Sequence, residues 1–386
     1  MSSAADIPTV LYLSGFSDIV GGGQLSFFLL LRNLNRSRFR PVVLCPEPGE
    51  VSREVSAMGI EVLFLEQPKL RVWKLWEIIR YAASLQRLIS AAGAGLVHCD
   101  TLTSAFLAGL ANLFGGIPVV FHARVSGSGG VMDKIVPFLC DRIICVSKAV
   151  AARFAGSPYF ANKVRVIYNG VDTAEFNPLL SGDEFRKSNG IPSAVPLLGY
   201  CGQLVEVKGL AVLIEAFGII KNAIPETRLV LAGRGDFEGE LRAKVRGLNM
   251  EDSVIFAGFV ENTPQFMAAL DVFILPSFWL EGFSRALLEA MACGKPVITT
   301  PLGGNTETVV EGETGFFFQA GSSADLARKA VSLLKNRTLA ERLGENGRRR
   351  AVELFDIRRT SEKIHGLYDE FLSGPSRRER GGGVSA

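Results

Sequence analysis

The sequence predicts an α/β fold in which two Rossmann-like domains, each built on a parallel sheet, face each other across a cleft. Three observations lead to this prediction. At 386 residues the chain is long for one hydrophobic core and suitable for two. Short runs rich in β-branched residues alternate with helical patterns along its length. Polar residues cluster just after these runs, where open parallel sheets bind ligands.

The expected strands fall into two groups. They cover residues 10–13, 42–45, 62–65, 96–99, 119–121, 143–146 and 164–167 in the first half, and 197–201, 228–232, 254–257, 272–275, 297–299 and 316–318 in the second. We expect an N-terminal domain over 1–175, a linker rich in Pro, Gly and Ser over 176–195, a C-terminal domain over 196–350, helices over 351–373 that return to the N-terminal domain, and a disordered tail over 374–386.

Composition excludes several classes of protein. A net charge of +3 with 21% charged residues is not typical of a nucleic-acid-binding protein. The six cysteines lie in or beside apolar runs and form no CxxC pair, which indicates reduced thiols rather than a zinc or redox site. The first residues lack a basic stretch followed by an apolar one, so we expect no signal peptide and a cytoplasmic protein.

The segment from Glu281 to Glu289 is the most informative part of the chain. Glu281 and Gly282 directly precede a predicted helix, and Glu289 lies two turns along it. A helix N-terminus attracts phosphate, and flanking carboxylates can bind sugar hydroxyls. Two glutamates at this spacing are more often solvated surface residues. Their position after the apolar run 272–276 favours a site for a nucleotide-sugar.

Lys208 is the candidate cation for a diphosphate. An anionic leaving group must be met by fixed cations, a helix end or a metal. The chain contains no Asp-x-Asp, the commonest metal-binding signature of sugar-nucleotide enzymes, so we expect no metal and no other cofactor. The alternative is a solvated surface lysine. Arg234 and Arg285 are further candidate cations.

Two features of the first half fall at the ends of predicted strands. Gly22 and Gly23 precede an amphipathic helix and either form a tight turn or allow a phosphate to approach the backbone. His98 and His122 end two strands, where both are expected to face the cleft. A structural role is the commoner one for a single histidine, but His122 is the better candidate for positioning a hydroxyl or stabilising developing charge.

A helical stretch over 72–89 carries Trp73 and Trp76 among several basic residues. Such a helix either packs on its own sheet or lies on an anionic membrane. In the second case the protein contacts the inner face of the membrane and its acceptor is lipid-linked.

The order of motifs resembles glycosyltransferase family 4, which has the GT-B fold. The resemblance covers nearly the whole chain and is carried by GGGQLSFFLLLRNL, VIYNGVDTAEF, YCGQLVEVKGLAVLIEAF, LVLAGRGDFEGEL, VIFAGFV and, most specifically, the block from DVFILPSFWLEGFSRALLEAM to TGFFF. It implies a retaining, metal-independent transfer of a sugar from a nucleotide-sugar donor. The N-terminal domain would bind the acceptor and the C-terminal domain the donor.

The resemblance also implies roles for residues. Glu281 would contact the donor sugar near its reacting end, and Glu289 the ribose. The diphosphate would meet backbone N–H groups, those of Gly282, Phe283 and Ser284. The family commonly has a histidine at the position of His122, near the donor sugar. It usually has arginine where this chain has Gln203, which puts full donor affinity in doubt unless another arginine compensates.

The expected function is therefore hexosyl transfer to a saccharide or lipid-linked acceptor, in polysaccharide or glycolipid biosynthesis. Two other functions remain open on the same scaffold. One is a sugar-nucleotide epimerase or a glycan phosphorylase, and the other is a non-catalytic protein that binds nucleotide-sugars. Substrates, linkage and oligomeric state are not predictable from these motifs.

Overall fold

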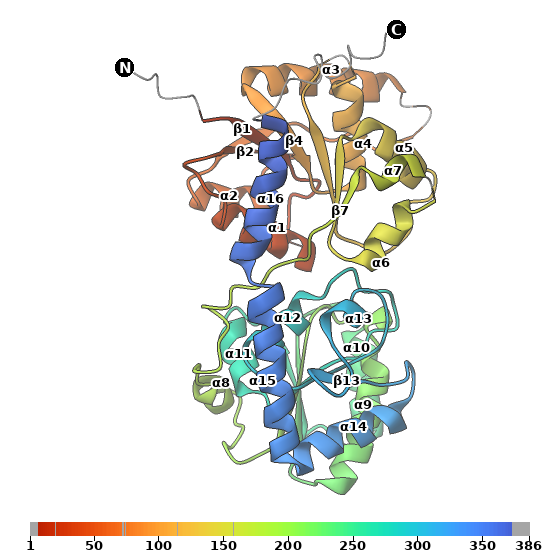
Figure 1. Ribbon diagram of the computed structural model, residues 1–386. Coiled ribbons are helices and arrows are strands. Elements are labelled where there is room, and N and C mark those ends of the chain that lie inside the picture. The colour runs from red at the N-terminus through yellow and green to blue at the C-terminus, as the bar shows by residue number, and fades with distance from the viewer. Residues whose placement is uncertain are drawn as a thin grey trace. The chain divides into compact units, whose positions relative to one another are not determined.

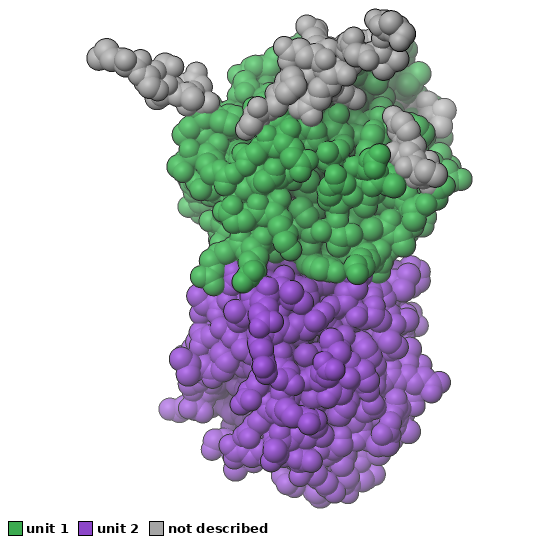
Figure 2. All heavy atoms as spheres, viewed as in Figure 1, with its two compact units in different colours: residues 1–168, 358–386 green, residues 169–357 purple. Residues whose placement is uncertain are grey.

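The computed structural model describes residues 7–19, 21–71, 73, 75–113, 115–156 and 158–372. The tail 374–386, which we expect to be disordered, lies outside these residues. The chain forms two compact units (Figure 2). Unit 1 comprises Met1–Tyr168 and Arg358–Ala386, and unit 2 comprises Asn169–Ile357.

Unit 1 contains a seven-stranded parallel sheet with the order β3-β2-β1-β4-β5-β6-β7 (Figure 1). Its strands are β1 (Thr9–Leu13), β2 (Arg40–Cys45), β3 (Glu61–Phe64), β4 (Ala94–Cys99), β5 (Val119–Ala123), β6 (Arg142–Cys145) and β7 (Val164–Val166). Its helices are α1 (Gly22–Arg32), α2 (Glu50–Ala57), α3 (Leu75–Ala91), α4 (Leu102–Ala111), α5 (Met132–Leu139), α6 (Lys148–Ala151), η2 (Ala152–Phe154), α7 (Pro158–Ala161) and α16 (Ile357–Leu372).

Strands β1 and β2 are buried almost throughout, which is why they appear in the sequence as nearly continuous apolar runs. Their side chains form one core with the amphipathic helices that cover the sheet. The last helix, α16, supplies Ile364, Leu367 and Tyr368 to this core, where Val10 and Tyr12 of β1 also lie. The C-terminal end of the described chain is therefore part of the same unit as its beginning.

Unit 2 contains a six-stranded parallel sheet with the order β10-β9-β8-β11-β12-β13. Its strands are β8 (Leu197–Cys201), β9 (Arg228–Ala232), β10 (Val254–Gly258), β11 (Val272–Leu275), β12 (Val297–Thr299) and β13 (Gly315–Phe317). Its helices are α8 (Asp183–Ser188), η3 (Glu206–Lys208), α9 (Leu210–Ala223), α10 (Glu238–Gly247), α11 (Thr263–Ala269), α12 (Arg285–Ala292), α13 (Asn305–Thr308), α14 (Ser323–Lys335) and α15 (Arg337–Leu354).

Both sheets have the topology that creates a ligand site. In unit 1 the strand order reverses between β1 and β4, and in unit 2 it reverses between β8 and β11. Connections leave such neighbouring strands in opposite directions, and a crevice opens at their carboxyl ends. The two parallel sheets with alternating helices confirm the predicted α/β fold of two domains.

The stretch expected to be a linker, 176–195, is part of unit 2 and includes α8. Arg186 explains why it is held there. This arginine is buried, donates to the carbonyls of Ala269 and Val195, and pairs with Asp271 at 3.0 Å. The chain instead passes between the units at Tyr168–Asn169 and at Ile357–Arg358.

Candidate active site

The loop that follows β11 in unit 2 carries Glu281, the central residue of the site. Its Oε1 accepts a hydrogen bond from the Nζ of Lys208 at 2.6 Å and another from the Ser277 hydroxyl. Lys208 ends η3, which follows β8, so the two strands beside the reversal in strand order bring these residues together. No hydrogen bond to the second oxygen, Oε2, occurs among the described residues, and that oxygen is available to a ligand.

Helix α12 begins at Arg285, four residues after Glu281. Ser284 caps it, because its hydroxyl accepts a hydrogen bond from the Leu287 N–H at 3.4 Å. The Phe283 side chain is buried against Phe355, with ring centroids 5.3 Å apart. Phe283 therefore has only its backbone to offer a ligand, and its role in binding a diphosphate stays a prediction from the family resemblance.

Glu289 lies inside α12 and is buried, with 6% of its surface exposed. Arg285 donates to Oε1 of Glu289 twice, from Nη2 at 2.8 Å and from Nε at 3.2 Å. Within the described part of the chain Oε2 of Glu289 accepts no hydrogen bond. Glu281 and Glu289 thus share one arrangement, in which one carboxylate oxygen is held by a cation and the other is open.

Glycines hold this loop in place. The ideal Cβ of an alanine at Gly303 would lie 2.3 Å from the Glu281 carbonyl oxygen, and one at Gly304 would lie 2.2 Å from that of Gly282. Gly209 has a φ of +70° and leaves no room beside the carbonyl of Pro276. Our sequence analysis missed these three residues. The glycine pair after β12 was a visible signal, but the backbone that it contacts is not readable from the sequence.

Gln203 and Arg234 lie at the ends of β8 and β9, and both side chains are exposed. Their backbones are adjacent, because the Leu204 N–H donates to the Arg234 carbonyl at 2.9 Å. Arg234 forms no ion pair with any described residue, whereas Arg285 is already paired with Glu289. Of the two arginines that could replace the cation missing at Gln203, Arg234 is the one left available.

In unit 1, helix α1 begins at Gly22. The Gln24 side chain accepts a hydrogen bond from the Gly21 N–H at 3.0 Å and so stabilises the start of the helix. A Cβ at Gly22 would meet nothing within 4 Å, and one at Gly23 would meet only the Arg124 Cδ at 3.8 Å. The protein itself does not require glycine at either position, so the space in front of α1 is open to a ligand.

His122 ends β5 beside this helix and is 3% exposed. Its Nδ1 lies 3.2 Å from the Nε2 of His98 and 3.3 Å from the Nη2 of Arg124. Its Nε2 is buried and has no hydrogen-bond partner among the described residues. A buried N–H or lone pair without a partner is costly, so this atom marks a place for a ligand group.

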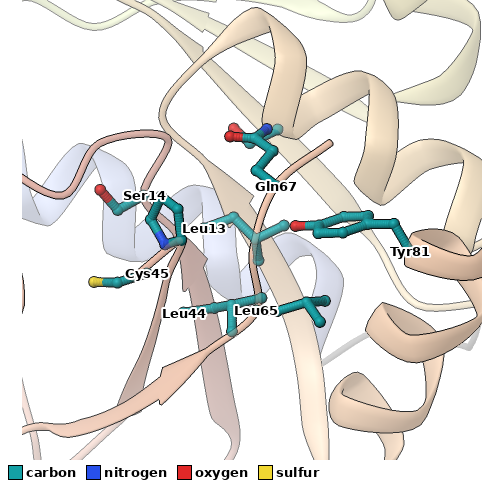
Figure 3. Close-up of a pocket in the computed structure, with 9 residues that line it drawn as sticks. Leu13, Ser14, Leu44, Cys45, Leu65, Gln67 and Tyr81 are labelled. Atoms are coloured by element: carbon teal, nitrogen blue, oxygen red, sulfur yellow. The ribbon is translucent and has the colours of Figure 1, made fainter. Parts of the chain in front are cut away.

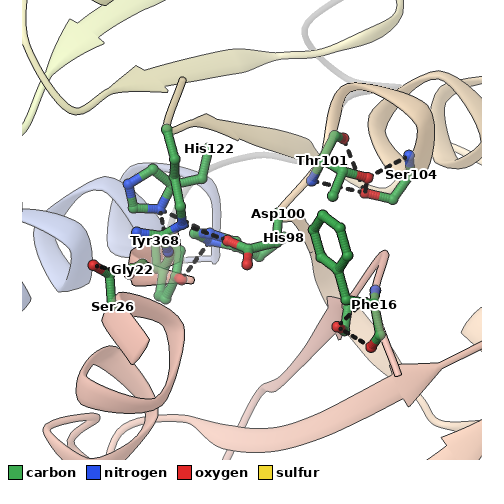
Figure 4. A network of polar contacts seen from close by, with 11 residues as sticks. Phe16, Gly22, Ser26, His98, Asp100, Thr101, Ser104, His122 and Tyr368 are labelled. Carbon is green, nitrogen blue, oxygen red and sulfur yellow. Dashed lines mark hydrogen bonds and ion pairs between the residues drawn. The ribbon is translucent and has the colours of Figure 1, made fainter. Parts of the chain in front are cut away.

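His98 does not face open space, contrary to the expectation that both histidines would. It is fully buried, and its Nδ1 lies 2.7 Å from the hydroxyl of Tyr368 in α16 (Figure 4). Burial and the nearby Arg124 guanidinium lower the pKa of His98 to about 3. The same causes, with His98 as a third, lower the pKa of His122 well below its usual value. Both imidazoles are therefore neutral at physiological pH.

A possible group of metal ligands occurs at the same place. His98, Asp100 and His122 each offer one ligand atom, and these atoms lie within 4.8 Å of one another. Arg124, however, donates to Asp100 at 2.7 Å and points a second N–H at His122. A guanidinium in contact with two of the three ligands disfavours a second cation, so these residues do not fit a metal.

A small pocket lies at the carboxyl ends of the first strands of unit 1 (Figure 3). It is lined by Leu13, Ser14, Leu44, Cys45, Pro46, Leu65, Gln67, Tyr81 and Ser104. The Nε2 of Gln67 is buried there without a hydrogen-bond partner in the described part of the structure. Sequence analysis did not identify this pocket, because its polar groups come from five separate segments.

Helix α3, together with Trp73 just before it, exposes a cluster of large apolar side chains, which we call the tryptophan patch and define as Trp73, Leu75, Trp76 and Ile79. Trp73 and Trp76 are each 77% exposed. Arg71 stacks on Trp73 at 5.5 Å, and Arg80 is exposed beside the patch. Tyr81, Leu85 and Ile89 face the core instead. Across the described residues, every helix is too short or too polar to span a bilayer.

The predicted site residues thus form two groups at the carboxyl ends of the two sheets. Unit 1 holds Gly22, Gly23 and His122, and unit 2 holds Gln203, Lys208, Arg234, Glu281, Gly282, Phe283, Ser284, Arg285 and Glu289.

Comparison with known families agrees with this division. Residues 20–175 match the model described as Glycosyltransferase Family 4, and residues 181–350 match the model described as Glycosyl transferases group 1.

Among curated relatives, the lipopolysaccharide core biosynthesis mannosyltransferase LpsB of Rhizobium meliloti (strain 1021) is 29% identical over 239 residues, or 60% of this chain and 66% of the relative. The chain thus spans slightly less than two thirds of that relative. The Escherichia coli UDP-Gal:alpha-D-GlcNAc-diphosphoundecaprenol alpha-1,3-galactosyltransferase is 27% identical over 368 residues, which is 90% of this chain and 93% of the relative.

Solved structures also include proteins with a similar fold over nearly the whole chain. The crystal structure of Anabaena Alr3699/HepE in complex with UDP and glucose is 25% identical and superimposes with a TM-score of 0.81, over 93% of this chain and 99% of that one. With two family models that together span most of the chain, and with the expected fold in both units, the chain belongs to glycosyltransferase family 4.

Proposed function

We propose that this protein is a metal-independent, retaining glycosyltransferase that moves a hexose from a nucleotide-sugar to a saccharide or lipid-linked acceptor. The observation that carries the proposal is the matched arrangement of Glu281 and Glu289 around the start of α12. Each carboxylate has one oxygen bound by a cation and one oxygen open. The open oxygens can accept hydrogen bonds from sugar hydroxyls, while the helix N-terminus between them binds the diphosphate.

In this proposal each group has a defined task. Glu289 accepts from the ribose, and Glu281 accepts from the donor sugar near its reacting carbon. The diphosphate meets the backbone N–H groups at 282–284 and the ammonium of Lys208. The bond between the sugar and the phosphate oxygen breaks, and the acceptor oxygen bonds to the same face of the sugar. The departing phosphate takes the proton of the acceptor hydroxyl, so charge and atoms balance.

Metal independence is supported by the cations that the chain itself provides. Lys208 and the N-terminus of α12 adjoin the proposed diphosphate site, and Arg234 is available at the end of β9. Together they can meet the charge that develops on the leaving group. Arg234 then takes the task of the arginine that this chain lacks at position 203.

The comparisons support the choice of substrates to test. The Anabaena structure contains UDP and glucose, and the E. coli relative is named for transfer from UDP-Gal to a diphosphoundecaprenol-linked sugar. We propose a UDP-sugar as donor and an acceptor that binds unit 1, where the pocket with Gln67 offers a buried N–H. Polysaccharide or glycolipid biosynthesis is the proposed pathway.

A thermal-shift screen against UDP-, GDP-, ADP- and dTDP-sugars identifies the donor. Transfer to candidate acceptors is then measured with and without a chelator, and the anomeric configuration of the product is read by NMR. We expect turnover that survives the chelator and a product with the donor's configuration. Inversion contradicts the retaining mechanism, and loss of turnover with the chelator contradicts metal independence. Release of nucleotide without an acceptor indicates epimerisation or hydrolysis.

We further propose that the tryptophan patch lies on an anionic lipid surface, where tryptophan and arginine side chains are favoured together. This placement explains why Trp76 remains exposed on a helix whose other face is buried, and why Trp73 is exposed just before that helix. In a flotation assay with vesicles that contain anionic lipid, the wild type is expected to float with the vesicles. The Trp73→Ser, Trp76→Ser double variant is expected to stay in the dense layer. Equal flotation of the two proteins, or none by the wild type, rules the patch out as a membrane contact.

A further inference from the structure

The buried polar chain behind His122 connects side chains from three strands and the last helix of unit 1. It runs from Tyr12 on β1 to Tyr368 on α16, then to His98 on β4 and His122 on β5. The hydroxyls of Tyr12 and Tyr368 are 3.2 Å apart. The Tyr368 hydroxyl lies 2.7 Å from His98 Nδ1, and His98 Nε2 lies 3.2 Å from His122 Nδ1. Figure 4 shows Tyr368, His98 and His122. Every member is buried.

Arg124 determines the direction of the hydrogen bonds that link Tyr368, His98 and His122. A guanidinium can only donate, and the Nη2 of Arg124 lies 3.3 Å from His122 Nδ1. That nitrogen must therefore carry a lone pair, so the proton of neutral His122 is on Nε2. His98 Nε2, which faces the same lone pair, must carry a proton and donate as well.

The direction of the next hydrogen bond follows from the position of the proton on His98. A neutral His98 with its proton on Nε2 has a lone pair on Nδ1, so the Tyr368 hydroxyl donates to it. The Tyr12 hydroxyl lies 3.2 Å from the Tyr368 oxygen. Burial keeps both imidazoles neutral, since the pKa of each is lowered. From Tyr368 through His98 to His122 the donors point the same way, and the last one is the Nε2–H of His122, which lacks a partner in the described structure.

We infer that Arg124, His98 and Tyr368 are positioning residues that hold His122 in its Nε2–H form, so that it serves as a neutral hydrogen-bond donor to an oxygen of a sugar bound at the carboxyl end of β5 in unit 1. His122 is then not a general base, because the atom that it presents has no lone pair. This inference rests on the proposed function only for the identity of the ligand. The proton positions themselves follow from the structure of unit 1.

The direction of the bonds makes two substitutions of His98 unequal. In His98→Gln the amide nitrogen lies near the place of Nε2 and can still donate to His122. In His98→Asn the amide group lies near the place of Nδ1 and meets Tyr368 instead, so His122 loses one of its two donors. Tyr368→Phe removes the donor to His98 while keeping the ring, and Tyr12→Phe removes only the outermost hydroxyl.

Proton positions can be read directly in the full-length protein, because the chain has only three histidines. Long-range ¹H–¹⁵N correlation spectra of histidine-labelled protein distinguish Nε2–H from Nδ1–H imidazoles without any turnover. We expect His98 and His122 to be Nε2–H and neutral between about pH 6 and 8, in the wild type and in Tyr12→Phe. An Nδ1–H form of His122 in the wild type, or its protonation in this range, overturns the inference.

Activity supplies the second readout. We expect kcat/KM to fall about tenfold in His98→Asn, the size of one lost hydrogen bond, and to fall less in His98→Gln. Equal losses with unchanged imidazole spectra would show that His98 only fills space. A correct set of proton positions in a protein without transferase activity would contradict the proposed function and leave the proton assignment standing.

Discussion

Both groups of site residues lie at the carboxyl ends of parallel strands, but one is mainly neutral and hydrogen-bonded whereas the other is made of ion pairs. In unit 1 the polar groups around His122 form a buried chain that ends in a neutral donor, with one ion pair, Arg124–Asp100, beside it. In unit 2 the groups are charged and paired with each other, Lys208 with Glu281 and Arg285 with Glu289.

The difference shows how each group meets a ligand. A buried neutral chain has one arrangement and presents its donor in a fixed direction before any ligand arrives. The Lys208–Glu281 pair is partly exposed and can exchange partners at modest cost, so Lys208 can turn to a phosphate while Glu281 turns to a hydroxyl. We therefore propose that the first group orients its ligand and that the second neutralises charge. Four substitutions or conditions test this comparison.

Glu281→Gln is expected to have the largest effect. It removes the negative charge that faces the reacting sugar and weakens the hold on Lys208, so turnover should fall about a thousandfold while the fold persists. Glu215→Gln is a matched control, because Glu215 also pairs with a lysine, Lys244, at 2.5 Å on the surface of unit 2. Steady-state kinetics and circular dichroism compare the two, and near-normal turnover of Glu281→Gln removes this residue from the mechanism.

Acidification should act on the buried chain of unit 1. The pKa of His98 is about 3 in the folded protein and about 6.5 when unfolded, so below pH 6.5 the unfolded state binds the additional proton. The free energy of unfolding should therefore decrease as the pH is lowered. Between pH 6.5 and 5, His98 should account for about 2 kcal/mol of this decrease.

Urea denaturation at several pH values measures how the free energy of unfolding depends on pH in the wild type and in His98→Asn. The variant is expected to lose less stability on acidification, although it is less stable at pH 7.5. Parallel pH dependences of the two proteins would mean that His98 is not held neutral by burial.

Arg234→Gln tests charge neutralisation in unit 2. We expect KM for the donor to rise about tenfold with a small change in stability, because Arg234 is exposed and no ion pair is lost. If Arg234 takes the place of the arginine missing at Gln203, then adding Gln203→Arg to the variant should restore most of the affinity. A double-mutant cycle gives the coupling between the two positions. Additive effects would show that the two side chains act on different parts of the donor.

Gly22→Ala tests the space in front of α1 and should have the smallest effect. Alanine fits without contact and favours the helix, so stability should rise by up to about 1 kcal/mol. Affinity for the ligand of unit 1 should nevertheless fall a few-fold, because the methyl group would take up space in front of α1. Gly247→Ala, also helical with open space at its Cβ, is the control that should stabilise without affecting affinity. Unchanged affinity in Gly22→Ala would place the ligand away from α1.

Sequence patterns were informative wherever the determining interactions are local. The alternation of apolar runs and helical periodicity predicted both sheets, because parallel strands buried on both faces must be apolar along their length. The apolar run before Glu281 and the helix after it placed the two glutamates at a strand end and within a helix. The expectation of a linker over 176–195 was made from composition alone, and composition does not reveal that Arg186 anchors this stretch to α11.

What only the tertiary structure decided concerns partners far apart in the chain. Tyr368 reaches His98 from 270 positions away, Lys208 meets Glu281 across 73, and Gly303 accommodates the backbone of Glu281. The sequence is compatible with an Arg285 that faces either a phosphate or Glu289. In the folded protein Arg285 pairs with Glu289. The sequence by itself determined which residue types stand at the ends of the strands, because that is a matter of local order. Which atoms they present to a ligand depends on neighbours that folding alone brings together, and a hydrogen bond or ion pair has a direction only when its partner is in place.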